Sequence, residues 1–222
     1  MNKKISHANG LPASSTAAPA KNLDLHGSVP DTSPIVLLLI DVITDFSFED
    51  GHRVVDSAIT MAERLRRLKC RCCDAHISAI YVNDNSGRWR EDRQAVIARC
   101  LESESRGRRV AERLRPEADD YFIAKPKHSG FFATALERLL IYFQAHTLIL
   151  TGIGTNLCVL FTASDAHMRD YRLVVPSDCV TAIDRSDHRS ALGQMRRLFD
   201  ADTRESRHLD LRRISGHTTS PR

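Results

Sequence analysis

Hydrophobic positions along this chain of 222 residues follow two patterns that take turns. Short continuous apolar runs, typical of strands buried on both faces, occur at 35–41, 78–83, 121–125, 147–151 and 172–176. Apolar residues spaced three or four apart, typical of amphipathic helices, occur at 54–72, 90–104, 134–143, 157–168 and 188–199. Strands and helices that alternate in this way predict an α/β fold, a three-layer α/β/α Rossmann-like arrangement around a parallel sheet.

Residues 1–33 lack both patterns. They are rich in Ser, Ala, Pro, Gly and Asn, and their few apolar side chains do not offset the entropy of ordering the segment. We therefore expect a flexible tail at 1–33 and one folded domain at 34–222. The tail has no continuous apolar secretion signal, and the chain has no run of the ~18 apolar residues that span a membrane. We expect a cytoplasmic protein without a membrane partner.

Cysteine content and charge narrow the function classes further. The six thiols are expected to be reduced, because no secretion signal precedes them. Cys70, Cys72 and Cys73 stand close together, but no second Cys or His pair follows at zinc-finger spacing, which favours plain helix residues. The net charge is +4, and the basic segment 106–115 carries no interleaved aromatic residues. This segment is typical of a solvated face, so we expect no nucleic-acid partner.

Side chains with useful chemistry follow the predicted strands at their carboxyl ends. Asp41, Asp84, Lys125 and the segment before Cys158 occupy such positions. Ligands of parallel α/β sheets bind in the crevice at this edge of the sheet. We therefore expect these side chains to converge on one crevice.

Cys158 stands where the fourth predicted strand turns into a helix, in the sequence TGIGTNLCV. A helix N-terminus favours the thiolate, and its free N–H groups can stabilise the oxyanion formed when a thiolate attacks a carbonyl. By position alone, a small buried hydrophobic residue is the alternative. Gly152 and Gly154 also fit part of a dinucleotide-binding loop, but Leu157 replaces its third glycine and the segment follows the wrong strand.

Asp41 and Lys125 supply a carboxylate and a cation at two other strand ends. Burial at a strand end raises the pKa of an aspartate towards the range used in acid–base catalysis, although a loop-fixing role is the alternative. A lysine in the crevice lowers the pKa of a thiol and keeps an aspartate ionised. Lys127 competes with Lys125 for this role, and a solvated surface lysine is the ordinary alternative. A thiol, a carboxylate and an ammonium together fit nucleophilic catalysis.

Four motifs in order are similar to the isochorismatase-like cysteine hydrolase superfamily, which includes nicotinamidases, N-carbamoylsarcosine amidase and ureidoacrylate amidohydrolase. They are LLLIDVITDF, YVNDNSGRW, KPKHSGFFATALERLL and TGIGTNLCVLFTASDAHMRDY, within a match from about residue 34 to about residue 199. The resemblance implies a catalytic triad of Asp41, Lys125 and Cys158. Lys125 fits better than Lys127, because the family's lysine precedes a Ser-Gly/Ala-Phe element by four residues, here beginning at Ser129.

The resemblance implies further features of the site. A cis peptide bond is expected between Ile153 and Gly154, and the oxyanion hole would be formed by the N–H groups of Gly154 and Cys158. Phe46, Trp89 and Phe131 are candidates for the walls of a substrate pocket, with ordinary core or rim positions as the alternative. The resemblance also implies a homo-oligomer.

Two departures from the family pattern bear on the reaction. Many relatives carry Gln two residues after the first-strand aspartate, where this chain has Ile43. Nicotinamidases bind a divalent metal through Asp-x-His and a further His, whereas this chain has Asp84 and no histidine in NDNSGRWRED. We therefore expect neither a metal nor a cofactor.

The predicted function is that of a cysteine hydrolase that cleaves an amide or ureido C–N bond of a small molecule through a thioester. In this hypothesis Asp41 takes the thiol proton, protonates the departing amine and activates the hydrolytic water. Two alternatives stay open: a vinyl-ether hydrolase of the isochorismatase type, and a non-catalytic binding scaffold of the same fold. Because vinyl-ether cleavage does not need the cysteine, Cys158 favours chemistry at a carbonyl.

Overall fold

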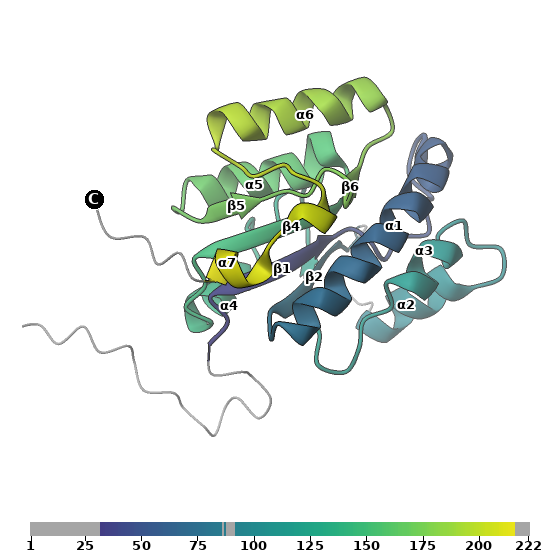
Figure 1. The fold of residues 1–222 in the computed structure, drawn as a ribbon. Coiled ribbons are helices and arrows are strands. Elements are labelled where there is room, and N and C mark those ends of the chain that lie inside the picture. The colour runs from purple at the N-terminus through teal and green to yellow at the C-terminus, as the bar shows by residue number, and fades with distance from the viewer. Residues whose placement is uncertain (1–31, 86, 88–91, 216–222) are drawn as a thin grey trace, which may run out of the picture.

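Parallel strands form the centre of the computed structural model, which describes residues 32–85, 87 and 92–215. In these residues the strand order is β3-β2-β1-β4-β5, and the short β6 also pairs with β4 (Figure 1). The strands are β1 (Ile35–Ile40), β2 (Ser78–Asp84), β3 (Tyr121–Lys125), β4 (Thr147–Ile153), β5 (Arg172–Val174) and β6 (Val180–Thr181). Their parallel pairing brings all carboxyl ends to one edge of the sheet.

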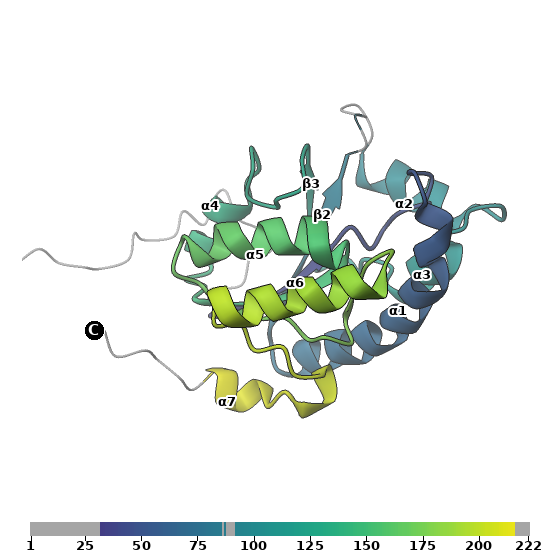
Figure 2. The same ribbon diagram turned by 90° about the horizontal axis from the view of Figure 1, so that it is seen from above.

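Helices cover both faces of this sheet. They are α1 (Gly51–Asp74), α2 (Arg93–Leu101), α3 (Arg108–Arg113), α4 (Leu136–Tyr142), α5 (Leu160–His167), α6 (Arg185–Leu198) and α7 (Leu211–Ser215), with a π-helical turn η2 (Thr155–Val159) and a 3₁₀ turn η3 (Ser206–His208). Residues of α1, α2, α3 and α7 pack on one face, and residues of α4, α5 and α6 pack on the other. Helices α5 and α6 run side by side in both views (Figures 1 and 2).

Strand β1 shows why the central run is apolar throughout. Alternate side chains point to opposite faces of a strand. Leu37 and Leu39 belong to the core under α1, whereas Leu38 and Ile40 belong to the core under α5. All six residues of β1 are buried. The predicted three-layer α/β/α fold is confirmed.

The structure differs from the predicted elements mainly where they are short or charged. The expected helix at 157–168 begins as the π-helical turn η2 and becomes regular only at Leu160. Helix α3 was not predicted, because charged residues surround the Val110 and Ala111 that it buries. The predicted tail at 1–33 lies almost wholly outside the described residues. No described helix has both the length and the apolar character needed to cross a membrane.

Candidate active site

Asp41, Lys125 and Cys158 meet at the carboxyl edge of the sheet. Asp41 directly follows β1, Lys125 is the last residue of β3, and Cys158 lies in the turn η2 after β4. The Lys125 ammonium is fully buried, with its Nζ 2.8 Å from Asp41 Oδ2 and 3.6 Å from Cys158 Sγ. The convergence expected from the sequence is therefore present in the structure. Lys127 is exposed and contributes its carbonyl oxygen, which accepts a hydrogen bond from Lys125 Nζ at 3.2 Å.

The backbone of the neighbouring strands fixes the Asp41 carboxylate. Asp41 takes a left-handed conformation with φ 52°, and its N–H donates to the Val82 carbonyl at 3.0 Å. The Asp84 N–H donates to Asp41 Oδ1 at 2.6 Å, so the two carboxylate oxygens have different partners. Asp84 is paired with Lys125 across β2 and β3, and its Oδ2 lies 3.7 Å from Lys125 Nζ. Asp84 therefore adjoins the three converging residues.

Burial and charge set the protonation states of this group. Burial raises the pKa of Asp41, although the Lys125 charge and a hydrogen bond with the Cys158 thiol act against it. Burial, together with the nearby Asp41 charge, also raises the pKa of Cys158. Burial lowers the pKa of Lys125, but the charges of Asp41 and Cys158 outweigh this effect and raise it overall. The resting state thus pairs a neutral thiol with an ammonium and with a carboxylate that binds protons more readily than usual.

The turn that carries Cys158 depends on a left-handed glycine. Gly154 has φ 79° and ψ 63°, and its carbonyl accepts hydrogen bonds from the N–H groups of Leu157 at 2.9 Å and Val159 at 3.1 Å. These two hydrogen bonds close the π-helical turn around Cys158. A Cβ atom at position 154 would lie 3.4 Å from the Cys158 nitrogen. Glycine therefore allows the left-handed conformation, whereas a Cβ at 3.4 Å would make an ordinary contact.

Two expectations about this turn are wrong. The described residues contain no cis peptide bond, so the bond between Ile153 and Gly154 is trans. The Gly154 N–H donates to the Thr181 carbonyl at 3.0 Å, which takes it away from an oxyanion hole. The physical reason is β6, which pairs beside Gly152 and Ile153 and extends the parallel ladder into the turn. The Cys158 N–H is the other predicted oxyanion donor, and it does not bond to Thr181.

Comparison with known proteins decides the family. The family model of the isochorismatase domain matches residues 36–205. The chain belongs to the isochorismatase family. It is 35% identical over 166 residues to the uncharacterized isochorismatase family protein YaaI of Bacillus subtilis (strain 168), a match that covers 75% of this chain and 91% of YaaI. The resemblance expected from the motifs is confirmed, and the protein is an isochorismatase-family hydrolase.

Two further proteins are similar to this chain, one over a short stretch of sequence and the other in its fold. Over 69 residues the chain is 41% identical to ureidoacrylate amidohydrolase RutB of Serratia proteamaculans (strain 568), which is 31% of this chain and 28% of that protein. The crystal structure of N-carbamoylsarcosine amidase from Thermoplasma acidophilum matches with a TM-score of 0.61 at 24% identity, over 79% of this chain and 98% of that chain. At this identity the second likeness shows the fold alone.

His128 is a member of the hydrolase's site that the sequence analysis missed. Its Nδ1 lies 3.8 Å from Cys158 Sγ, and its ring centroid lies 5.6 Å from that of Phe161. His128 is exposed, whereas Lys125, which also contacts the sulfur, is buried. The available signal was position, because His128 follows Lys125 by three residues in the loop after the same strand.

Hydrogen bonds behind the site join the His128 loop to the helix that follows Cys158. The buried Thr162 hydroxyl donates to the Cys158 carbonyl at 2.7 Å and accepts from the Gly130 N–H at 3.0 Å. The Ser129 hydroxyl donates to the Asp165 carboxylate of α5 and accepts from the Phe131 N–H at 3.2 Å. These bonds hold the loop after β3 against the start of α5.

Of the three residues predicted to line the substrate pocket, the two that the structure describes lie in different environments. Phe46 is fully buried in the core under α1, so the prediction that it lines a substrate pocket is wrong. The chain takes φ 56° at Phe46, which turns the side chain into the core rather than towards the crevice. Phe131 is buried in the same cluster as Cys158, with the Arg169 guanidinium 4.8 Å from its ring, and its role as a wall stays a prediction. Trp89 lies outside the described residues.

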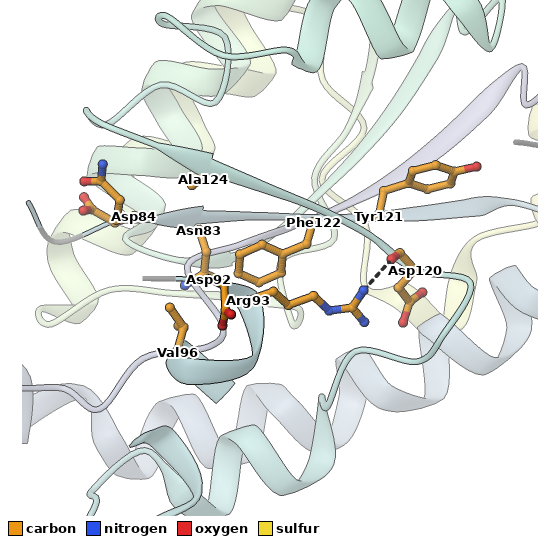
Figure 3. A pocket seen from close by; sticks show the side chains of 10 residues that line it. Asn83, Asp84, Asp92, Arg93, Val96, Asp120, Tyr121, Phe122 and Ala124 are labelled. Carbon is orange, nitrogen blue, oxygen red and sulfur yellow. Dashed lines mark hydrogen bonds between the residues drawn. The ribbon is translucent and has the colours of Figure 1, made fainter. Parts of the chain in front are cut away.

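A cavity of about 440 Å³ opens beside Asp84, between the ends of β2 and β3 and the start of α2 (Figure 3). Asp84 stands at one end of this cavity, and the Phe122 ring and the Arg93 side chain lie farther along it. Arg93 is held by the carbonyl oxygens of Asp120 at 3.2 Å and Glu117 at 2.6 Å. Asp84 therefore connects this cavity to Lys125. In the described part of the chain no group of three His, Cys, Asp or Glu side chains is placed to hold a metal ion.

Proposed function

We propose that this isochorismatase-family hydrolase cleaves an amide or ureido C–N bond of a small molecule through a thioester on Cys158. The observation that carries the proposal is the position of the buried Lys125 ammonium, 2.8 Å from the Asp41 carboxylate and 3.6 Å from the Cys158 sulfur. Such a cation favours the thiolate at the moment of attack and holds the acid–base group beside it.

Acylation begins with a proton transfer on the buried side of the sulfur. Asp41 accepts the thiol proton, and the sulfur forms a bond to the carbonyl carbon. The negative charge moves from Asp41 to the substrate oxygen, so Lys125 keeps a counter-charge throughout. The Cys158 N–H is the backbone donor that we assign to the oxyanion. The tetrahedral intermediate then breaks its C–N bond, the departing nitrogen takes up a proton from solvent, and a thioester remains.

Hydrolysis of the thioester completes the cycle. Water attacks the carbonyl carbon and gives up a proton to solvent, the C–S bond breaks, and the thiolate recovers the proton that Asp41 holds. The similarity to ureidoacrylate amidohydrolase RutB supports an amide-like bond. The thiol favours this chemistry over vinyl-ether cleavage, because attack on a carbonyl gives the sulfur a role in the reaction.

A substitution of the nucleophile tests the proposal. Wild-type protein is screened with a panel of small amides and ureides, and product release is compared with that of Cys158→Ala. We expect the variant to lose the activity by a factor of at least about 10³, since the covalent route is removed. Cys70→Ala, a change at an exposed thiol on α1, is the matched control and keeps the activity. A Cys158→Ala variant with the wild-type rate refutes the covalent mechanism.

Alkylation separates an enzyme from a binding scaffold without any substrate. Iodoacetamide is added near neutral pH, and labelling of each cysteine is followed by peptide mass spectrometry. We expect Cys158 to react much faster than the fully buried Cys100, because Asp41 can take the thiol proton of Cys158 as its sulfur attacks the reagent. Equal rates at the two cysteines favour the scaffold.

A further inference from the structure

The proton-exchanging groups around the Cys158 sulfur differ in burial. Lys125 is fully buried and Asp41 nearly so, whereas His128 is exposed and its Nδ1 lies 3.8 Å from the sulfur. The imidazole packs beside the Phe161 ring of α5 and belongs to the loop that the Ser129–Asp165 and Gly130–Thr162 hydrogen bonds fix. A group held at this place contacts the sulfur that forms the thioester and is also exposed to solvent.

Asp41 is poorly placed to exchange protons with both the thiol and a group in solvent. Its Oδ1 accepts the Asp84 N–H at 2.6 Å, its Oδ2 accepts Lys125 Nζ at 2.8 Å, and its side chain is only 14% exposed. His128 is exposed, so solvent reaches this neighbour of the sulfur, and imidazole is the side chain that gives and takes a proton near neutral pH.

We propose that His128 is a second catalytic residue, which protonates the leaving nitrogen and then activates the hydrolytic water, while Asp41 handles only the thiol proton. This inference rests on the proposed function and deepens it. In acylation the C–N bond breaks and the nitrogen takes a proton from the imidazolium. In deacylation the neutral imidazole takes a proton from water as its oxygen bonds to the carbonyl carbon. The C–S bond then breaks, and the sulfur recovers its proton from Asp41, which restores every group.

The two half-reactions of p-nitrophenyl acetate separate this role from a structural one. Its leaving group, p-nitrophenolate, departs without a proton, so acylation of Cys158 does not need His128. Acylation is measured as p-nitrophenolate release with enzyme in excess, and deacylation as loss of the acetyl group from Cys158 by mass spectrometry. We expect His128→Gln to acylate within about threefold of wild type and to deacylate about 100-fold more slowly, the usual contribution of a general base.

The controls keep each outcome decisive. His128→Asn provides a second neutral variant, and His208→Gln, at an exposed histidine in η3, behaves like wild type in both steps. Deacylation of His128→Gln within about threefold of wild type overturns the inference. An equal slowing of both steps also overturns it, because it indicates a positioning role. A wild-type protein that acquires no acetyl group on Cys158 removes the proposed function itself, which is a different result.

Discussion

Replacement of Lys125 by Met tests whether the buried charges depend on each other. The Lys125 ammonium is fully buried and lies 2.8 Å from Asp41, whose side chain is 14% exposed. Lys125→Met keeps the length and apolar stem of the side chain but leaves the Asp41 carboxylate without its counter-ion. Breaking a buried pair in this way costs about 3–5 kcal/mol of unfolding free energy. Asp84, the other acid near Lys125, is 43% exposed and stays solvated, so most of the loss comes from Asp41.

The loss also has a defined pH dependence. Burial already raises the pKa of Asp41, and without Lys125 the pKa rises further. A group with a raised pKa in the folded state favours folding at low pH and loses that contribution as pH rises through its folded pKa. At acidic pH Asp41 is protonated in the variant and the penalty is small. The penalty then grows with pH, by at most ~1.4 kcal/mol per pH unit.

Chemical denaturation across pH 5 to 8 measures these differences in unfolding free energy, with the slope of the transition checked for constancy. Lys125→Met is compared with the double variant Lys125→Met/Asp41→Asn, in which no buried charge is left unpaired. We expect the double variant to recover most of the lost stability. Lys127→Met, at the exposed lysine of the same loop, is the control and stays within about 0.5 kcal/mol of wild type. A loss that does not change with pH, or a double variant no more stable than Lys125→Met, refutes the reasoning.

Three further predictions concern the same crevice. Gly154→Ala loses about 1–2 kcal/mol in thermal unfolding, because a side chain is strained at φ 79°; an unchanged melting temperature contradicts this. Thr162→Val leaves the Gly130 N–H without its acceptor and loses about 1–3 kcal/mol by denaturation, whereas Thr60→Val on the exposed face of α1 does not. Asp41→Asn removes the pH dependence of stability that the raised pKa of Asp41 produces, seen as a flatter curve of unfolding free energy above pH 4.

Much of the site was predictable because one rule of the fold applies to it. Apolar runs located the strands, and parallel strands bring their carboxyl ends to one edge. Asp41 and Lys125 were therefore placed together without any knowledge of their distance. The hydrophobic pattern also located most of the helices, because a helix that packs on a sheet has apolar residues spaced three or four apart.

The rest depends on contacts that leave no such pattern. Strand β6 has only two residues, Val180 and Thr181, yet it captures the Gly154 N–H and changes the turn before Cys158. Phe46 faces the core because of a single positive φ value, which sequence spacing does not report. His128 contacts the sulfur through the path of one loop, and that path depends on hydrogen bonds made by α5.

Two unfavourable features lie close to Cys158. Asp41 is a non-glycine residue at φ 52°, and Lys125 is a fully buried charge. Each of these costs free energy, and a fold that needed only stability would do better with apolar residues there. The fully buried β1 and β4, which flank the crevice, supply the packing that offsets these costs. A buried ion pair beside one thiol, while the sheet next to it is regular and apolar, supports a chemical role for Cys158 over a structural one.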